Sequence, residues 1–284
     1  MKKSILKIRW RYMRKKYFLS TFLIALLAIT LSACGQNKNQ SIYQTVKETK
    51  SITWGVKADT PLFGSMSIKD GKVRGFEIDL AEALTHKILG KQAKANFVTT
   101  TANTKIQLLK NRNVDAVIAA MTITPERKKQ VEFSKPYFPA GQSIMVAKNS
   151  KINNVKDLNN KRVLIVKGTT SADAVRKFAP KAEILQFDDY GQAFAALKAD
   201  QGDAFVTDNG ILAGILRDNS GYKIAGGTFT NQPYGIAVNK GQNEMMEHIN
   251  LALTQLEKDG TYNRLVEKWF GNIPGFNVKE IEKY

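Results

Sequence analysis

The spacing of apolar residues in the first half of the chain predicts alternating strands and helices. Short uninterrupted apolar runs are typical of buried strands, whereas apolar residues at every third or fourth position are typical of a helix. Phe76–Leu89 shows the helical spacing and ends at Gly90, a common helix stop. The expected elements are strand 52–56, helix 76–89, strand 97–99, helix 105–111 and strand 115–119. This β-α-β-α-β order predicts an α/β unit with a largely parallel sheet.

The same alternation restarts after the proline-flanked segment 136–139. The pattern predicts strands over 143–147, 162–166, 184–187, 204–207 and 234–238. It predicts helices over 155–158, 171–178, 190–199, 209–216, 244–256 and 262–270. A second α/β unit, reached and left through extended segments, indicates two lobes joined by a hinge around a ligand cleft.

The first 50 residues show the signs of export rather than of a folded core. Residues 1–33 hold eight lysines and arginines and no acid, and the 16 residues before Cys34 carry no charge. A basic start, a short apolar run and small residues at a cleavage point describe a secretory signal. Leu31–Cys34 also resembles a lipoprotein signal, in which the cysteine is diacylated. We therefore expect a lipoprotein signal peptide over 1–33, a lipid-modified Cys34 and a flexible tether over 34–50, the alternative being an uncleaved transmembrane anchor.

Charge and composition exclude several classes of function. The chain has 43 lysines and arginines against 25 acids, a net charge of +18, but without residues 1–33 the excess is +10 over 251 residues. Dispersed cations on an exported chain do not form the basic stripe that a nucleic-acid surface needs. One cysteine and two histidines offer little for a metal centre or for His-centred catalysis. We expect no cofactor, no metal and no nucleic-acid partner.

Eight segments between residues 52 and 271 resemble the bacterial extracellular solute-binding proteins of family 3, and they occur in the family's order. They are Trp54–Thr60, Gly75–Ala81, Asn113–Lys128, Phe133–Tyr137, Lys167–Ser171, Gly202–Asp208, Tyr234–Ala237 and Gly260–Gly271. The resemblance implies a periplasmic-binding-protein-like α/β fold with lobe 1 over 51–139 and 235–284 and lobe 2 over 142–232. The crossings between the lobes are expected near 140–141 and 232–234.

The same resemblance implies a lipid-anchored receptor on the extracellular or periplasmic side of the cell membrane. It would bind a polar amino acid and deliver it to an ABC permease. The chain has no Gly-x-x-x-x-Gly-Lys-Ser/Thr motif, so the ATPase must be a separate chain. The alternatives are a receptor for arginine, lysine or cystine, or a secreted enzyme of the same fold. No nucleophile–base set stands out for the enzyme alternative.

Two residues resemble those that hold the charged ends of a free amino acid in this family. Arg127 matches the arginine for the α-carboxylate, and a guanidinium suits that group because it donates two parallel hydrogen bonds. Asp208 matches the acid for the α-ammonium. The alternatives are that Arg127 belongs to a solvated cluster with Lys128 and Lys129, and that Asp208 is a helix N-cap.

The remaining ligand-binding candidates are Lys57, Lys105, Ala120, Met121, Thr122, Thr169, Thr170 and Ser171. Residues 120–122 resemble a stretch that offers main-chain groups and a hydroxyl to the ligand. Residues 169–171 open a helix whose N–H groups suit a carboxylate, with a plain N-cap as the alternative.

Lys57 and Lys105 decide the expected ligand. Relatives that take acidic amino acids or glutamine resemble this chain at both positions. Two cations beside a side-chain pocket favour a carboxylate or an amide carbonyl and oppose a cationic ligand. We therefore expect glutamate, glutamine or aspartate, unless either lysine is merely exposed. Phe76, Trp269 and Phe270 stand at helical spacing and are expected in the core.

Overall fold

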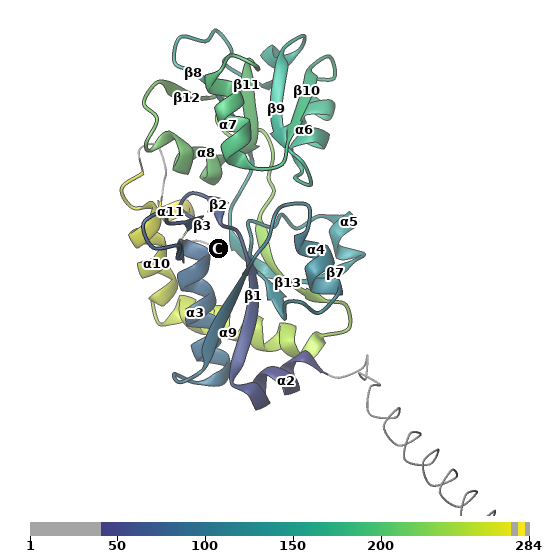
Figure 1. The fold of residues 1–284 in the computed structure, drawn as a ribbon, viewed down its shortest axis with the longest axis vertical. Helices are drawn as coiled ribbons and strands as arrows, with labels where there is room; N and C mark the ends of the chain where they lie inside the picture. The colour runs from purple at the N-terminus through teal and green to yellow at the C-terminus, as the bar shows by residue number, and fades with distance from the viewer. Residues whose placement is uncertain (1–40, 274–277, 282–284) are drawn as a thin grey trace, which may run out of the picture. The chain divides into compact units, whose positions relative to one another are not determined.

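The computed structural model describes residues 41–273 and 278–281 (Figure 1). Residues 41–284 form one compact unit. The expected signal peptide, Cys34 and the first part of the expected tether lie outside the described residues. In the described part of the chain, no helix is both long enough and apolar enough to cross a membrane.

Lobe 1 is built on a five-stranded sheet in the order β5-β1-β6-β13-β7. Its strands are β1 (Ser51–Val56), β5 (Lys94–Thr99), β6 (Ala116–Val117), β7 (Val131–Phe138) and β13 (Tyr234–Asn239). β5, β1 and β6 are parallel, as expected, but β13 is antiparallel to both β6 and β7. β7 therefore runs in the same direction as β5, β1 and β6, so the predicted largely parallel sheet is confirmed, with β13 as its one antiparallel strand. The chain leaves lobe 1 after β7 and returns through the adjacent β13, so these two strands run in opposite directions.

Lobe 2 has a second five-stranded sheet in the order β10-β9-β11-β8-β12. Its strands are β8 (Gln142–Ala147), β9 (Arg162–Val166), β10 (Glu183–Phe187), β11 (Ala204–Asp208) and β12 (Tyr222–Ala225). β10, β9 and β11 are parallel, whereas β8 is antiparallel to its neighbours β11 and β12. Two segments, residues 139–141 and 226–233, join the sheets, which confirms the predicted fold of two α/β lobes with a two-segment hinge.

Helices cover both sheets (Figure 1). They are α3 (Phe76–Leu89), α4 (Lys105–Lys110), α5 (Pro125–Lys128), α6 (Ser171–Phe178), α7 (Tyr190–Lys198), α8 (Asn209–Leu216), α9 (Asn243–Lys258), α10 (Thr261–Phe270) and α11 (Val278–Ile281), with a 3-10 turn η2 (Val155–Leu158). In lobe 1, α3, α9 and α10 pack on one another. Phe76 and Phe270 are fully buried there, as predicted, while Trp269 is half-buried and donates to Asp79 (2.7 Å).

Residues 41–50 form a helix rather than the predicted tether. α2 (Ile42–Thr49) begins at the N-cap Ser41, and Ile42 and Val46, one turn apart, are buried in the core of lobe 1. Gln242, at the start of α9, accepts from the main-chain N–H of Ile42 (2.7 Å). The prediction failed because the overall polarity of the segment hides two apolar residues on one helical face.

A small sheet of β2 (Asp59–Thr60), β3 (Gly64–Met66) and β4 (Val73–Arg74) follows β1. The loop between β2 and β3 places the buried Phe63 against α8 of lobe 2. A Cβ on Gly210 would lie 2.9 Å from the Phe63 ring, and a Cβ on Gly214 would lie 2.8 Å from the carbonyl oxygen of Pro61. The two glycines therefore let α8 pack closely on lobe 1, and Asp208 lies at the start of this helix.

Candidate ligand-binding cleft

The predicted site residues follow the carboxyl ends of parallel strands. In lobe 1, Lys57 follows β1 and residues 119–122 follow β6, while in lobe 2 residues 168–171 follow β9 and Asp208 ends β11. Because β1 pairs in parallel with β6, and β9 with β11, these ends meet at one edge of each sheet. Hydrogen bonds from Arg127 and Tyr234 to lobe 2 join the two edges.

Arg127 reaches across the cleft from α5. Its Nη1 donates to the carbonyl oxygen of Thr122 (2.8 Å) and its Nη2 to that of Gly168 in lobe 2 (3.0 Å). A guanidinium has five N–H groups, so three remain for a carboxylate. Burial lowers the pKa of Arg127, and the nearby Asp208 opposes that shift. Lys128 and Lys129 are exposed, so the solvated-cluster alternative does not describe Arg127.

Asp208 is buried, and both of its oxygens accept a hydrogen bond. Oδ1 accepts from Nε2 of Gln142 (2.5 Å), and Oδ2 accepts from the hydroxyl of Tyr234 (2.7 Å). Burial raises the pKa of Asp208 to about 6. The hydrogen bonds from Tyr234 and Gln142 and the positive charges of Arg127 and Lys105 oppose this rise in the pKa. Asp208 occupies the N-cap position of α8, but its side chain makes no capping hydrogen bond. The N-cap alternative therefore does not account for this carboxylate.

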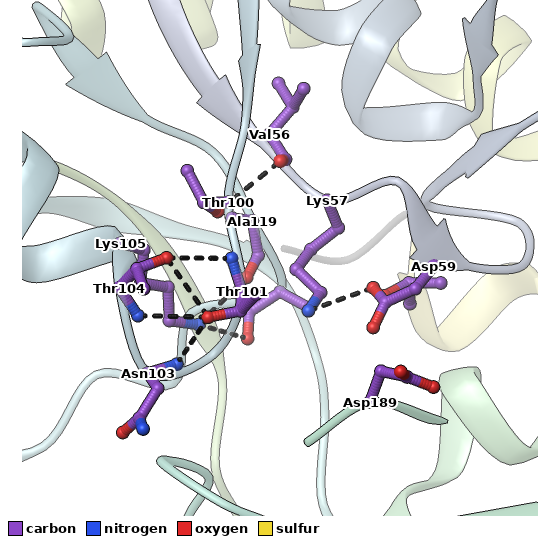
Figure 2. Close-up of polar contacts among 12 residues, drawn as sticks. Val56, Lys57, Asp59, Thr100, Thr101, Asn103, Thr104, Lys105, Ala119 and Asp189 are labelled. Atoms are coloured by element: carbon purple, nitrogen blue, oxygen red, sulfur yellow. Dashed lines mark hydrogen bonds and ion pairs between the residues drawn. The ribbon is translucent and has the colours of Figure 1, made fainter. Parts of the chain in front are cut away.

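Lys57 is only 1% exposed, which rules out the alternative of a solvated lysine. Its Nζ lies 2.9 Å from Oδ1 of Asp59, but the contact is poorly aligned, and the ammonium makes no hydrogen bond within the described part of the chain. Tyr190 of lobe 2 places its ring 5.1 Å below the same nitrogen. Figure 2 shows the Lys57 side chain extended toward Asp59. The pair presents N–H donors beside a carboxylate acceptor.

Lys105 is also buried, at 3% exposed, but it is bonded differently. Its Nζ donates to the carbonyl oxygens of Ala119 (2.9 Å) and Ala120 (3.4 Å), the first of which is drawn in Figure 2. Burial holds the pKa of Lys105 well below its ordinary value, and the positive charges of Arg127 and Lys57 add to that effect. Lys105 therefore binds main chain in this structure, and the solvated alternative is wrong for it too.

The start of α6 provides the lobe 2 side of the cleft. Thr169 Oγ1 donates to the carbonyl oxygen of Val166 (2.6 Å), and Thr170 Oγ1 donates to Oε1 of Gln232 (2.8 Å). Thr170 occupies the N-cap position without a capping hydrogen bond, so the plain N-cap alternative fails for it. Ser171 is fully buried, and its N–H donates a long bond to Thr169 Oγ1 (3.4 Å).

Four buried side-chain atoms around the cleft lack a hydrogen-bond partner in the described chain: Lys57 Nζ, Glu77 Oε2, Gln142 Oε1 and Thr207 Oγ1. Five further neighbours of the site were not predicted from the sequence: Asp59, Glu77, Gln142, Tyr190 and Tyr234. The described residues include no cluster of three or more His, Cys, Asp or Glu that could hold a metal.

Comparisons with known proteins agree with this architecture. Residues 52–272 match the family described as bacterial extracellular solute-binding proteins, family 3. The chain is 44% identical over 271 residues to the ABC transporter glutamine-binding protein GlnH of Bacillus subtilis (strain 168), covering 92% of this chain and 99% of that protein. It is 44% identical over 239 residues to the glutamine-binding protein of Geobacillus stearothermophilus, covering 78% and 91% respectively.

A solved structure extends the comparison. An ancestral arginine-binding protein bound to glutamine superposes with a TM-score of 0.73 and is 44% identical, covering 78% of this chain and 99% of that one. The family match spans both sheets and both crossings, and the relatives align over most of their own length. The chain belongs to the bacterial extracellular solute-binding proteins of family 3.

Proposed function

We propose that the chain is an extracellular receptor that binds free glutamine and presents it to an ABC import permease. The observation that carries the proposal is that two opposite charges, one from each lobe, meet the other lobe: Arg127, from α5, bonds to Gly168 of lobe 2, and Asp208, at the end of β11, bonds to Tyr234 of lobe 1. A free amino acid carries a carboxylate and an ammonium a few ångström apart, and each needs a group of opposite charge. The glutamine-binding names of the two relatives support this ligand.

In this proposal, main-chain groups complete the site for the α-carboxylate and α-ammonium. The carbonyl oxygens of Ala120 and Met121, the N–H of Met121 and the hydroxyl of Thr122 would contact the ligand from lobe 1, because the N–H of Ala120 already donates to Glu77. The N–H groups of residues 169–171, at the start of α6, would face the carboxylate with the positive end of the helix dipole.

The Lys57–Asp59 pair favours glutamine over glutamate as the ligand. A primary carboxamide has one acceptor oxygen and one donor nitrogen, and the pair offers one donor and one acceptor in the same pocket. A glutamate carboxylate has only acceptors, so it would face the Asp59 carboxylate with like charge. Arginine and lysine would bring a second cation toward Lys57 and Lys105, which disfavours them.

We also propose the export and the membrane attachment that are expected from the sequence. Residues 1–33 would direct export, and diacylated Cys34 would hold the receptor at the outer face of the cell membrane or in the periplasm. The proposed extents of the lobes are 51–139 with 235–284, and 142–232. The permease and its separate ATPase are the proposed protein partners, and the proposal includes neither an enzyme reaction nor a cofactor.

Titration calorimetry of residues 35–284 with each of the twenty amino acids tests the proposed function. We expect glutamine to bind most tightly, with a dissociation constant of about 1 μM, or roughly −8 kcal/mol. Binding of none of the twenty would refute the proposal, and preferred binding of arginine would refute the assigned side-chain pocket. Product analysis after prolonged incubation separates a receptor from an enzyme of the same fold.

Asp59→Asn is expected to reduce the preference for glutamine over glutamate by about tenfold. A tenfold change in the ratio of affinities corresponds to the free energy of about one hydrogen bond to a charged group. The substitution removes a charge that repels the glutamate side chain and leaves Lys57 without its counter-ion. Calorimetry with both ligands measures the ratio of the two affinities. Asp173→Asn, at an exposed acid of α6, is the control. Equal weakening of both ligands would show that Asp59 has no role in selecting the side chain.

Gly168→Ala is expected to weaken glutamine binding by at least about tenfold. Gly168 has a φ of +73°, and a Cβ there would lie 2.9 Å from main-chain atoms of Ala102 and Asn103 in lobe 1. The lobes would have to move apart to accept the methyl group. Calorimetry measures the loss, and Gly71→Ala, at a glycine with a φ of +67° where the added Cβ meets open space, is the matched control. Unchanged affinity would mean that binding does not need this approach of the lobes.

A further inference from the structure

Ala120 adopts a backbone conformation that alanine normally avoids. Its φ is +44°, in the left-handed region where Cβ crowds the neighbouring carbonyl oxygen. The residue is 7% exposed and lies in the stretch 120–122 that follows β6 at the cleft. Strained residues of this kind persist only where their surroundings hold them.

Two buried ionisable side chains, Glu77 and Lys105, hold this turn. Oε1 of Glu77 accepts from the main-chain N–H of Ala120 (2.7 Å). Nζ of Lys105 donates to the carbonyl oxygens of Ala119 (2.9 Å) and Ala120 (3.4 Å). Glu77 is fully buried and Lys105 is 3% exposed, so these hydrogen bonds do not compete with bulk water.

The position of Glu77 is itself fixed by the core of lobe 1. Glu77 lies in the first turn of α3, between the buried Phe76 and Ile78. The hydroxyl of Tyr137 donates to the same Oε1 that binds Ala120, and the carbonyl oxygen of Tyr137 accepts from the hydroxyl of Tyr262. This chain of bonds links α10, β7 and α3 to the cleft.

We infer that Glu77 is a positioning residue of the binding site, which acts with Lys105 to hold Ala120 in its left-handed conformation. The inference rests on the proposed function, because the main-chain groups of 120–122 are the ones assigned to the ligand. If the turn relaxed, these groups would change direction, and the hydrogen bond from Arg127 to the carbonyl oxygen of Thr122 would change with them, while Asp208 in lobe 2 stayed in place. The inference also gives Lys105 a main-chain role in place of the side-chain selection expected from the sequence.

A double-mutant cycle with Ala120→Gly tests the inference, because glycine adopts the left-handed conformation without strain. Glu77→Met removes the carboxylate oxygen that accepts from Ala120 and replaces the glutamate side chain by an unbranched apolar one of similar volume. We expect Glu77→Met to raise the dissociation constant for glutamine at least about tenfold in the natural chain. In the Ala120→Gly background, Glu77→Met should raise the dissociation constant for glutamine by no more than about threefold. A purely structural loss at Glu77 would cost the same in both backgrounds and would refute the inference.

Hydrogen exchange of the unliganded protein, followed by mass spectrometry over peptides that contain residue 120, gives a second readout. Glu77→Met should speed exchange there and leave peptides of lobe 2 unchanged. Glu77→Gln keeps an accepting oxygen, so it should restore protection and affinity, whereas failure of this rescue would contradict the inference. Glu82→Ala, at an exposed acid of the same helix, is the control. If the natural chain binds no amino acid, the proposed function fails, but the exchange comparison still decides the role of Glu77.

Discussion

Arg127→Ala is expected to abolish binding of every amino acid, with a loss of affinity of at least about 100-fold. Removing one member of a buried, hydrogen-bonded charge pair costs about 2–5 kcal/mol, because the ligand carboxylate is left desolvated without its partner. The substitution also removes the hydrogen bond to the carbonyl oxygen of Gly168, which joins the two lobes. Calorimetry with the full set of amino acids measures the effect.

Two further variants separate the causes of that loss. Arg127→Lys keeps the charge but not the planar fork, so it should recover only part of the affinity. Lys128→Ala, at the exposed neighbour, should bind as the natural chain does. If Arg127→Ala selectively loses some amino acids and keeps others, Arg127 contacts the side chain of the ligand rather than its α-carboxylate.

Elements with an uninterrupted apolar pattern were predictable from the sequence, whereas β7, whose pattern is interrupted, was not. The helix over 76–89 and the strand over 162–166 have the predicted bounds. β7 was missed because charged residues and Pro136 break its pattern of apolar positions. It forms nevertheless as the edge strand of its sheet, paired with β13 across two register shifts, and an edge strand tolerates proline.

The candidate site was predictable only in part, for a related reason. A family motif identifies residues such as Arg127 and Asp208 but gives no information about which distant side chains contact them. Gln142 stands in an apolar strand 66 positions from its partner Asp208, and Glu77 lies 43 positions from Ala120. Asp59 is the neighbour that could have been predicted from the sequence. It lies two residues after Lys57, and on an extended segment residues two apart point to the same face.

The pH dependence of binding is expected to follow Asp208, because its carboxylate is the proposed partner of the ligand ammonium. Burial raises the pKa of Asp208 to about 6, so the group takes up a proton as the pH falls through that value. Glutamine itself keeps both of its α-charges in this range. Affinity should therefore fall by up to about tenfold for each pH unit below 6. Calorimetry between about pH 5 and pH 7.5 measures the slope.

The stability of the unliganded protein should change in the opposite direction. A carboxyl group whose pKa is higher in the folded than in the unfolded chain binds protons more tightly when folded. Its contribution to stability is complete below its ordinary value of 3.8 and is lost as the pH rises through about 6. In thermal unfolding without ligand, the contribution of Asp208 to the stability of the folded chain should thus decline as the pH rises. Glutamine binding should strengthen over the same pH interval.

Asp208→Asn separates this carboxylate from the other buried groups that titrate near it. The asparagine oxygen can still accept from Gln142, and its amide N–H can donate to the hydroxyl of Tyr234, so the fold should persist, but the counter-charge for the ammonium is gone. Affinity for glutamine should fall by at least about 100-fold, and the residual binding should no longer vary between about pH 5 and pH 7.5. Asp188→Asn, at an exposed acid, should keep both the affinity and the slope of the natural chain. A slope that survives in Asp208→Asn would assign the titration to another buried group and would remove Asp208 from the ammonium site.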